Sequence, residues 1–170
     1  MTELYYDHIE SPIGTVVIVC DPDAMHSLHF VDRKPDAANG ATRKHDPLGY
    51  SARIKAYFDG DLAALDEIAV NPTGTPFQQR VWKALRTIPV GRTETYGHIA
   101  GQIGQPTASR AVGLANGQNP ISLVIPCHRV IGTNGKLTGY AGGIELKDKL
   151  LAWERGIRVG QAVLPVEFVA

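Results

Sequence analysis

The sequence is short of the features that would place it in a membrane or in an oxidising compartment. It has two cysteines among 170 residues, Cys20 and Cys127, and no C-x-x-C motif. This scarcity excludes a disulfide framework and the common zinc and thioredoxin motifs. No uncharged apolar run is long enough for a membrane span, and residues 1–7 lack the basic and then apolar order of a signal peptide. We therefore expect a protein of the cytoplasm with free thiols and no membrane contact.

The chain also lacks net charge, because its 17 basic residues balance its 17 acidic residues. The two signs are nevertheless segregated. Residues 1–71 hold 6 basic and 12 acidic residues, whereas residues 72–170 hold 11 basic and 5 acidic ones. This asymmetry, with the turn-forming run Asn71-Pro72-Thr73-Gly74 between the halves, predicts two domains, 1–71 and 72–170, of which the second can meet a polyanion. Chance segregation of solvated charge explains the counts equally well.

The acidic segment is predicted to form a β-meander. Its β-branched and aromatic runs are separated by short turns of Pro, Gly and Asp, which is the pattern of antiparallel strands joined tightly. The predicted strands cover residues 4–9, 15–20 and 25–31. A helix is predicted to start at Asp46 and Pro47, since Asp is a favoured N-cap and Pro a favoured first helical residue. The histidines of this segment and Cys20 follow no known zinc-ligand spacing, so we expect no metal site.

Four helices are predicted in the basic segment. The first starts at a capping box, Thr75-Pro76-Phe77-Gln78, in which the threonine and glutamine side chains each satisfy a backbone amide. Two short helices follow, with Thr95 and Thr107 as predicted N-caps, and their order of helix, turn and helix indicates a helix-turn-helix. The predicted helices cover residues 76–88, 96–103, 108–116 and 144–155.

The predicted helix 108–116 has an unusual composition. Small residues surround Arg110, so this helix can approach another surface closely. It is poorly suited to reading bases in a major groove, because it lacks a set of Asn, Gln and Arg side chains. Packing of two helices through small residues is an equally good explanation. After this helix, Thr133-Asn134-Gly135 lies between Val130-Ile131 and Lys136-Leu137 and predicts a β-hairpin, and a helix-turn-helix followed by a hairpin suggests a winged helix.

Cys127 stands after the apolar run 121–125 and Pro126, which predicts a thiol at the end of a strand. A free cysteine has a pKa of about 8.5, so a nucleophilic cysteine needs a base or a positive charge nearby. His128 and Arg129 supply both. The alternative is a buried and inert cysteine, which is the commoner role of this residue type. Glu154 lies among apolar residues near a helix C-terminus, where a partner such as a histidine would explain an anion, although a solvated carboxylate is slightly favoured by the local sequence alone.

Several ordered motifs resemble one known family. Pro126-Cys127-His128-Arg129-Val130, together with Ser109–Gly113, Asn119-Pro120 and Gly139–Gly143, is similar to the O6-alkylguanine-DNA alkyltransferases, also called methylated-DNA–protein-cysteine methyltransferases. The similarity is dense from Thr75 to Glu154, and the segment before it is similar in layout alone. It implies an α/β (α+β) fold with an N-terminal ribonuclease-H-like β-meander domain and a C-terminal winged-helix, or helix-turn-helix, alkyltransferase domain.

The resemblance also implies a function in direct-reversal DNA repair. Such a protein binds the minor groove of double-stranded DNA, flips out an alkylated guanine, and moves the alkyl group from O6 irreversibly to Cys127. O4-alkylthymine is the expected second substrate. One protein molecule is consumed per lesion, and no cofactor is implied. We expect a monomer in the cytoplasm, associated with the nucleoid in a bacterium, and leave cooperative assembly on DNA open.

Roles for single residues follow from the same resemblance. The catalytic set is Cys127 as nucleophile, His128 as base, Glu154 as the group that orients it, and Asn119, which holds the turn at the nucleophile. Neighbouring residues on a strand point to opposite faces, so either the backbone turns sharply at Cys127 or a water relays the proton. Arg110 is implied to enter the duplex and replace the flipped guanine, and Tyr96 to rotate the nucleotide and donate a hydrogen bond to the base. The expected DNA contacts further include Ser109, Ala111 and Gly113, and the expected base pocket consists of Tyr140, Ala141 and Val130.

Three other functions fit parts of the sequence. A lesion-binding protein of the alkyltransferase-like kind would lack the cysteine that this chain has at Cys127. A cysteine hydrolase using Cys127, His128 and Glu154 would need an oxyanion hole that we cannot locate in the sequence. A winged-helix transcription factor is disfavoured because helix 108–116 is poor at base readout.

Overall fold

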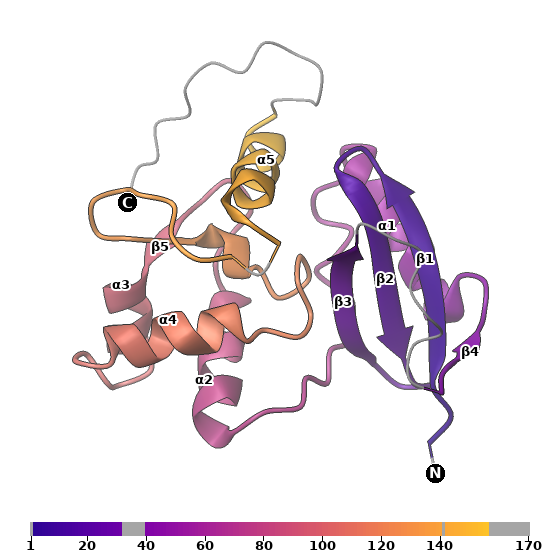
Figure 1. Ribbon diagram of the computed structural model, residues 1–170, viewed down its shortest axis with the longest axis horizontal. Coiled ribbons are helices and arrows are strands. Elements are labelled where there is room, and N and C mark those ends of the chain that lie inside the picture. The colour runs from indigo at the N-terminus through magenta and orange to yellow at the C-terminus, as the bar shows by residue number, and fades with distance from the viewer. Residues whose placement is uncertain (1, 32–39, 141, 157–170) are drawn as a thin grey trace. The chain divides into compact units, whose positions relative to one another are not determined.

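The computed structural model describes residues 2–31, 40–140 and 142–156, which form a mixed α/β fold of two compact units (Figure 1). The first unit extends to Thr73 and includes the segment Pro120–Val124. The second unit consists of Gly74–Asn119 and the chain from Ile125 onward. The first unit is thus discontinuous in sequence, and the domain bounds 1–71 and 72–170 stay a prediction. No helix among the described residues is long and apolar enough to cross a membrane.

The first unit is built on a four-stranded sheet in the order β3-β2-β1-β4. Strands β1 (Tyr5–Ser11), β2 (Gly14–Cys20) and β3 (Met25–Val31) pair antiparallel, which confirms the predicted meander. Strand β4 (Thr42–Arg43) pairs parallel with β1 and was not predicted, because two residues carry no recognisable period. The buried side chains of β2 include Val16, Ile18 and Cys20, so the apolar run of this strand forms the centre of the unit.

The helix of the first unit begins later than predicted. Pro47–Gly49 forms a single 3-10 turn, η1, in which Leu48 is left-handed with φ of 58°, and α1 covers Tyr50–Phe58. The physical reason is a distant contact: the backbone amide of Asp46 donates to the buried carboxylate of Asp7 at 3.0 Å. The N-cap residue of α1 is Gly49, so the prediction of Asp46 as the N-cap of this helix is wrong, although Asp46 Oδ1 accepts from the Ala52 amide in its first turn at 3.0 Å.

The second unit contains four helices and two very short strands among its described residues. The capping box at Thr75 is present, as is the predicted cap of Thr95, whose hydroxyl accepts from the His98 amide at 3.1 Å. The predicted cap at Thr107 is wrong: the N-cap residue is Ala108, without a side-chain bond, and the helix continues through Gly117. The helices are α2 (Pro76–Leu85), α3 (Tyr96–Gln102), α4 (Ser109–Gly117) and α5 (Ile144–Glu154).

The predicted hairpin after Cys127 is a turn without a second strand in the described part of this segment. The Gly132 amide donates to the Lys136 carbonyl at 3.0 Å, and Gly135 takes a φ of 75°, so a tight turn does form. However, β6 (Val130–Ile131) pairs parallel with β5 (Glu94–Thr95), which comes before α3. The distant strand β5 therefore pairs with β6 in place of the predicted second strand of a hairpin.

The apolar run before Cys127 is not a strand, contrary to the prediction. Ile121 makes one isolated bridge to Leu28, and Leu123 is left-handed with φ of 72°, which breaks the extended conformation. The chain then enters a 3-10 turn, η2 (Cys127–Arg129). The apolar run is thus buried without being extended, and Cys127 begins a helical turn instead of ending a strand.

Candidate active site

Two asparagines, one in the last turn of α4 and one just after this helix, bond the backbone around Cys127. Asn119 Nδ2 donates to the Ile125 carbonyl at 2.8 Å, and Asn116 Nδ2 donates to the Cys127 carbonyl at 3.3 Å. The expected bond from Asn119 to this turn is thus present. Asn116 was missed, although its position on the buried face of α4, beside Val112 and Ala115, was a signal that a polar side chain there has a specific partner.

The backbone turns sharply at the thiol, which is one of the two arrangements considered from the sequence. Successive side chains of a 3-10 turn point about 120° apart, so Cys127 and His128 do not take the opposite directions of a strand. Cys127 is 3% exposed and His128 is fully buried. The nucleophile and its neighbour therefore both lie in a site largely closed to water.

His128 and Glu154, 26 residues apart, form a buried pair. His128 Nε2 lies 2.7 Å from Glu154 Oε1, and both side chains are fully buried. Burial alone would raise the pKa of Glu154, but His128 and Arg129 outweigh burial, and the pKa of this carboxyl lies well below its usual range. Burial lowers the pKa of His128, against the opposing effect of Glu154. The pair is therefore a carboxylate and a neutral imidazole.

The protonation of Glu154 determines which imidazole nitrogen can act as a base. A carboxylate only accepts hydrogen bonds, so Nε2 of neutral His128 must carry the hydrogen and donate it. Nδ1 is then the unprotonated nitrogen. It is buried and has no hydrogen-bond partner among the described residues, which costs about 1–3 kcal/mol in a folded protein. A buried and unused acceptor next to a thiol is suited to taking the thiol proton.

Arg129 binds the same carboxylate through two of its guanidinium nitrogens. Its Nε donates to Glu154 Oε2 at 2.9 Å and its Nη2 to Oε1 at 2.8 Å, while Nη1 donates to the Ile88 carbonyl at 2.7 Å. This two-bond fork fixes the plane of the carboxylate. From the sequence Arg129 was considered as a charge near the thiol, whereas the structure places its charge on Glu154.

Burial disfavours the ionised form of the Cys127 thiol. Burial raises the pKa of Cys127, and a hydrogen bond from Asn119 and the charge of Lys147 oppose this rise without cancelling it. Cys20 is also buried, in the sheet of the first unit, where burial raises its pKa to about 11. Burial thus disfavours the thiolate at both cysteines; Asn119 and Lys147 oppose this effect at Cys127, and Lys44 opposes it at Cys20.

Lys147 is the charged residue that the sequence analysis missed. It is fully buried on α5, where its Nζ donates to the Val130 carbonyl at 2.5 Å and to the Thr138 carbonyl at 2.8 Å. Its position was readable from the sequence, because residues 147, 150, 151 and 154 follow the helical spacing of one buried face.

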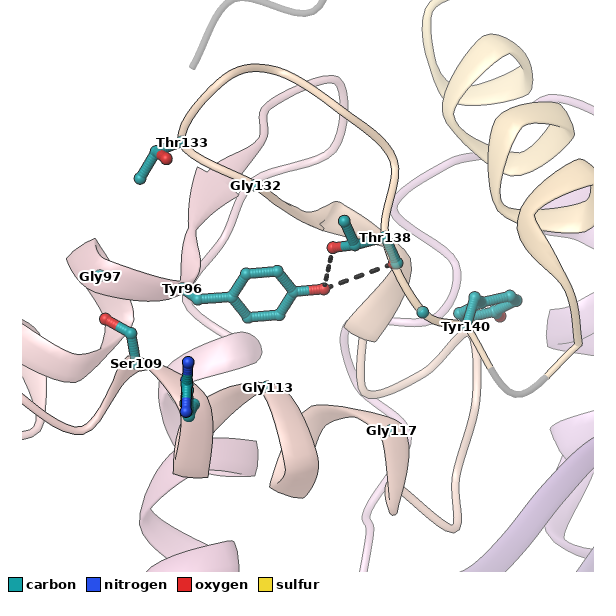
Figure 2. Close-up of a pocket in the computed structure, with 11 residues that line it drawn as sticks. Tyr96, Gly97, Ser109, Gly113, Gly117, Gly132, Thr133, Thr138 and Tyr140 are labelled. Carbon is teal, nitrogen blue, oxygen red and sulfur yellow. Dashed lines mark hydrogen bonds between the residues drawn. The ribbon is translucent and has the colours of Figure 1, made fainter.

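A pocket of about 670 Å³ opens between α3, α4 and the segment 132–140. Figure 2 shows the Tyr96 ring reaching across it toward Thr138, whose hydroxyl donates to the Tyr96 oxygen at 2.9 Å. The pocket brings together five of the predicted site residues, namely Tyr96, Ser109, Arg110, Gly113 and Tyr140. The other residues that line it are Gly97, Gly117, Gly132, Thr133, Thr138 and Gly139.

The remaining predicted residues lie elsewhere. Ala111 is exposed on α4, and Val130 is buried with its carbonyl bonded to Lys147. Ala141 lies outside the described residues. The catalytic candidates form a second cluster, made of Cys127, His128, Glu154 and Asn119. Among the described residues no group of three or more His, Cys, Asp or Glu is placed to hold a metal ion.

Comparisons with known proteins point to one family. Residues 76–156 match the family model described as 6-O-methylguanine DNA methyltransferase, DNA binding domain. A methylated-DNA–protein-cysteine methyltransferase of Methanosarcina acetivorans is 46% identical over 154 residues, covering 89% of this chain and 98% of the relative. The crystal structure of Mycobacterium tuberculosis O6-methylguanine methyltransferase is similar with a TM-score of 0.81 and 43% identity, covering 93% of this chain and 96% of that one. That of M. tuberculosis OGT in complex with DNA is similar with a TM-score of 0.78 and 42% identity, covering 92% and 96%.

Proposed function

This chain belongs to the methylated-DNA–protein-cysteine methyltransferase family, and we propose that Cys127 is the cysteine that accepts the alkyl group from O6-alkylguanine in duplex DNA. The observation that carries this proposal is the buried Nδ1 of His128, an acceptor without a described partner, in the residue that follows the thiol. Its other nitrogen is held by Glu154 at 2.7 Å. Nucleophile, base and orienting carboxylate are thus all in one closed site.

The chemical step is a displacement at the alkyl carbon. The Cys127 proton passes to His128 Nδ1, and the resulting imidazolium is stabilised by the Glu154 carboxylate. The sulfur forms a bond to the alkyl carbon while the bond from that carbon to O6 breaks, and the electron pair stays on the guanine, which takes up a proton. The thioether has no leaving group that would regenerate the thiol. Each protein molecule therefore acts once, and the step needs no cofactor.

DNA is the partner of this reaction, and we assign its contacts to the pocket side of α4. Arg110 lines the pocket from the first turn of α4, together with Ser109, Gly113 and Tyr96. A Cβ atom on Gly113 would lie 3.8 Å from the Tyr96 ring, so a small residue here leaves the ring free to contact a base. The target nucleotide must leave the stack, because a stacked guanine hides O6 from an in-line thiol. Arg110 then takes the place of the flipped nucleotide. Small residues such as Ala111 suit close approach to a minor groove.

The finer description of the fold belongs to the same proposal. We assign the first segment to a ribonuclease-H-like domain and the second to a winged-helix domain, with 1–71 and 72–170 as their bounds. Tyr140, Ala141 and the backbone of Val130 form the base pocket in this proposal. O4-alkylthymine as a second substrate, a monomeric state and a cytoplasmic location complete it. The alkyltransferase-like alternative gains no support, because this chain has Cys127 and its relatives carry the name of methyltransferases.

Label transfer from DNA tests the proposed function. A duplex with O6-methylguanine labelled in its methyl group should transfer the label to Cys127, and the amount should stop rising near one label per protein molecule. Peptide mapping by mass spectrometry locates the label, and Cys127→Ser should abolish it. Continued turnover, or label on Cys20, would contradict the proposal. In the same assay Arg110→Ala should slow transfer from duplex DNA far more than transfer from a free O6-alkylguanine base, because the free base needs no flipping.

A further inference from the structure

The Tyr96 ring spans the pocket, and its hydroxyl ends beside Thr138 (Figure 2). The Thr138 hydroxyl donates to the Tyr96 oxygen at 2.9 Å, and the Tyr96 hydroxyl donates to the Thr138 carbonyl at 3.4 Å. Tyr96 is the first residue of α3, whereas Thr138 lies 42 residues later in the segment that follows β6. The two residues therefore connect walls of the pocket that are distant in sequence.

The two hydrogen bonds between these residues differ in strength. Hydroxyl groups in proteins form hydrogen bonds of about 2.5–3.0 Å to oxygen acceptors. The bond that Thr138 donates lies in this range, and the bond that Tyr96 donates, at 3.4 Å, lies beyond it. The Thr138 carbonyl also accepts from the Lys147 ammonium group at 2.8 Å, which is the shorter and charge-assisted bond. The Tyr96 oxygen is thus held firmly as an acceptor, while its hydrogen is held weakly.

A weakly held hydrogen in the pocket suits the departing base. In the proposed reaction the guanine keeps the electron pair of the broken bond, so negative charge develops on the base. A donor that is already in place stabilises such a charge without reorganisation at the moment of reaction. Burial raises the pKa of Tyr96, and the hydrogen bond from Thr138 opposes this rise. Tyr96 is therefore a neutral phenol that has a hydrogen to donate.

We propose that Thr138 is a positioning residue for alkyl transfer, whose hydroxyl fixes Tyr96 as a hydrogen-bond donor to the base. This inference rests on the proposed function. A phenol oxygen that accepts from Thr138 has its own hydrogen left to give, and the base replaces the 3.4 Å contact as its acceptor. Thr138 keeps its own hydrogen throughout. Hydrogen bonds in a chain polarise one another, so the bond from Thr138 makes Tyr96 the stronger donor.

The surroundings of Thr138 fix the direction of its hydroxyl. A Cβ atom on Gly132 would lie 3.8 Å from the Thr138 methyl group, so the methyl branch lies beside this glycine at ordinary contact distance. The hydroxyl, which is the other branch of the same carbon, bonds Tyr96. Threonine is stiff about this carbon because it is β-branched. The backbone of Thr138 is anchored through its carbonyl by Lys147.

A double-mutant cycle with Tyr96→Phe tests this role. Thr138→Val removes the hydroxyl while keeping both branches and the carbonyl, and it should slow single-turnover label transfer from duplex DNA about tenfold. In the Tyr96→Phe background the same change should slow transfer by less than about twofold, because the group through which Thr138 acts is already absent. Thr138→Ser keeps the hydroxyl and should react within about threefold of the unchanged protein. Thr42→Val, at an exposed threonine of β4, is the matched control and should leave the rate unchanged.

A free O6-alkylguanine base separates hydrogen bonding to the base from DNA binding. Thr138→Val should slow transfer from the free base and from duplex DNA by similar factors, because the hydrogen bond is made to the base itself. Its Kd for duplex DNA, measured by fluorescence anisotropy, should stay within about twofold of the unchanged protein. If Thr138→Val does not fold, Thr138→Ala takes its place in the cycle.

A purely structural role makes a different prediction. It would slow transfer by the same factor with and without the Tyr96 hydroxyl, and Thr138→Ser would react as slowly as Thr138→Val. Either result would overturn the inference, as would a loss confined to duplex DNA or the absence of any loss in Thr138→Val. Failure of the unchanged protein to take label would instead refute the proposed function.

Discussion

Glu154 is the residue on which the buried site depends most, because one carboxylate accepts from two side chains at once. Oε1 accepts from His128 and both oxygens accept from Arg129. A lysine could not replace this arginine, since a single ammonium cannot reproduce the planar fork that sets the carboxylate plane. The orientation of the imidazole, and with it the free Nδ1, therefore depends on the ion pair between Glu154 and Arg129.

Replacing Glu154 by Gln should damage both stability and activity. The change leaves the guanidinium of Arg129 buried without a counter-charge, which typically costs about 3–5 kcal/mol of unfolding free energy. It also stops holding His128 in the tautomer with a free Nδ1, so alkyl transfer should slow about 100-fold or more. Urea denaturation and single-turnover label transfer measure the two effects. Glu145→Gln, at an exposed i,i+4 pair with Lys149 on the same helix, should change stability by less than about 1 kcal/mol.

Helix α4 links the proposed DNA surface to the nucleophile. Its buried face carries Val112, Ala115 and Asn116, and the Ala115 carbonyl accepts from the Trp82 indole at 2.9 Å. From this face Asn116 reaches the Cys127 backbone. The opposite face carries Arg110 and, one turn later, Leu114, which is 65% exposed and one of three large apolar side chains so exposed in the described ranges. Helix α4 thus packs against the protein through one face and exposes the other face to solvent.

Leu114→Ala should weaken DNA binding without affecting the chemistry. Leu114 lies on the same face as Arg110, so in the proposed complex it packs against the sugars of the groove. Losing this apolar contact should cost on the order of 1 kcal/mol, or about fivefold in Kd. Alanine keeps the helix, and the dependence of Kd on salt should not change, because no phosphate contact is lost. Fluorescence anisotropy measures Kd, and Leu48→Ala, an exposed leucine of the first unit, is the control. Equal Kd values for both variants would exclude the contact.

The molecule as a whole should lose stability in mild acid, through buried groups that stay unprotonated. The pKa of His128 is lowered by burial in the fold, whereas an unfolded histidine titrates near about 6.5. Below that pH the unfolded histidine binds a proton, whereas the folded His128 stays neutral to lower pH. The free energy of unfolding therefore decreases as the pH falls. His29, in β3, has a pKa lowered by burial and acts in the same direction. Glu154, with its lowered pKa, extends the loss to pH values below about 4.3.

Thermal unfolding followed by circular dichroism between pH 7.5 and 5 measures this loss. The Tm should be highest near pH 7.5 and should fall as pH drops through about 6.5. His128→Asn removes the main titrating group of the site, so its Tm, although lower at pH 7.5, should depend less on pH over this range. The variant His29→Asn separates the contribution of the first unit. A Tm that rises on acidification would show that His128 is charged in the folded protein.

The sequence by itself determined the features that depend on neighbours along the chain. The meander follows from alternating β-branched runs and turn formers, and the starts of α2 and α3 follow from hydroxyl caps at Thr75 and Thr95, because each needs contacts within a few residues. The several ordered motifs around and before Cys127 were together sufficient to indicate the family, since they consist of residue types in a fixed order. The pairing of His128 with Glu154 was expected from this resemblance, and the bond is present.

Tertiary structure decided what depends on contacts between distant residues. The buried Asp7 moved the start of α1, the partner β5 replaced a local hairpin strand for β6, and the asparagines at the end of α4 accompany a turn at Cys127 in place of a strand. Local propensity could not predict these outcomes, because long-range hydrogen bonds of buried groups outweigh differences of about 1 kcal/mol or less between local conformations. Lys147 shows the same limit: its helical position was readable, but that its buried ammonium group bonds the carbonyls of Val130 and Thr138 is a property of the folded chain alone.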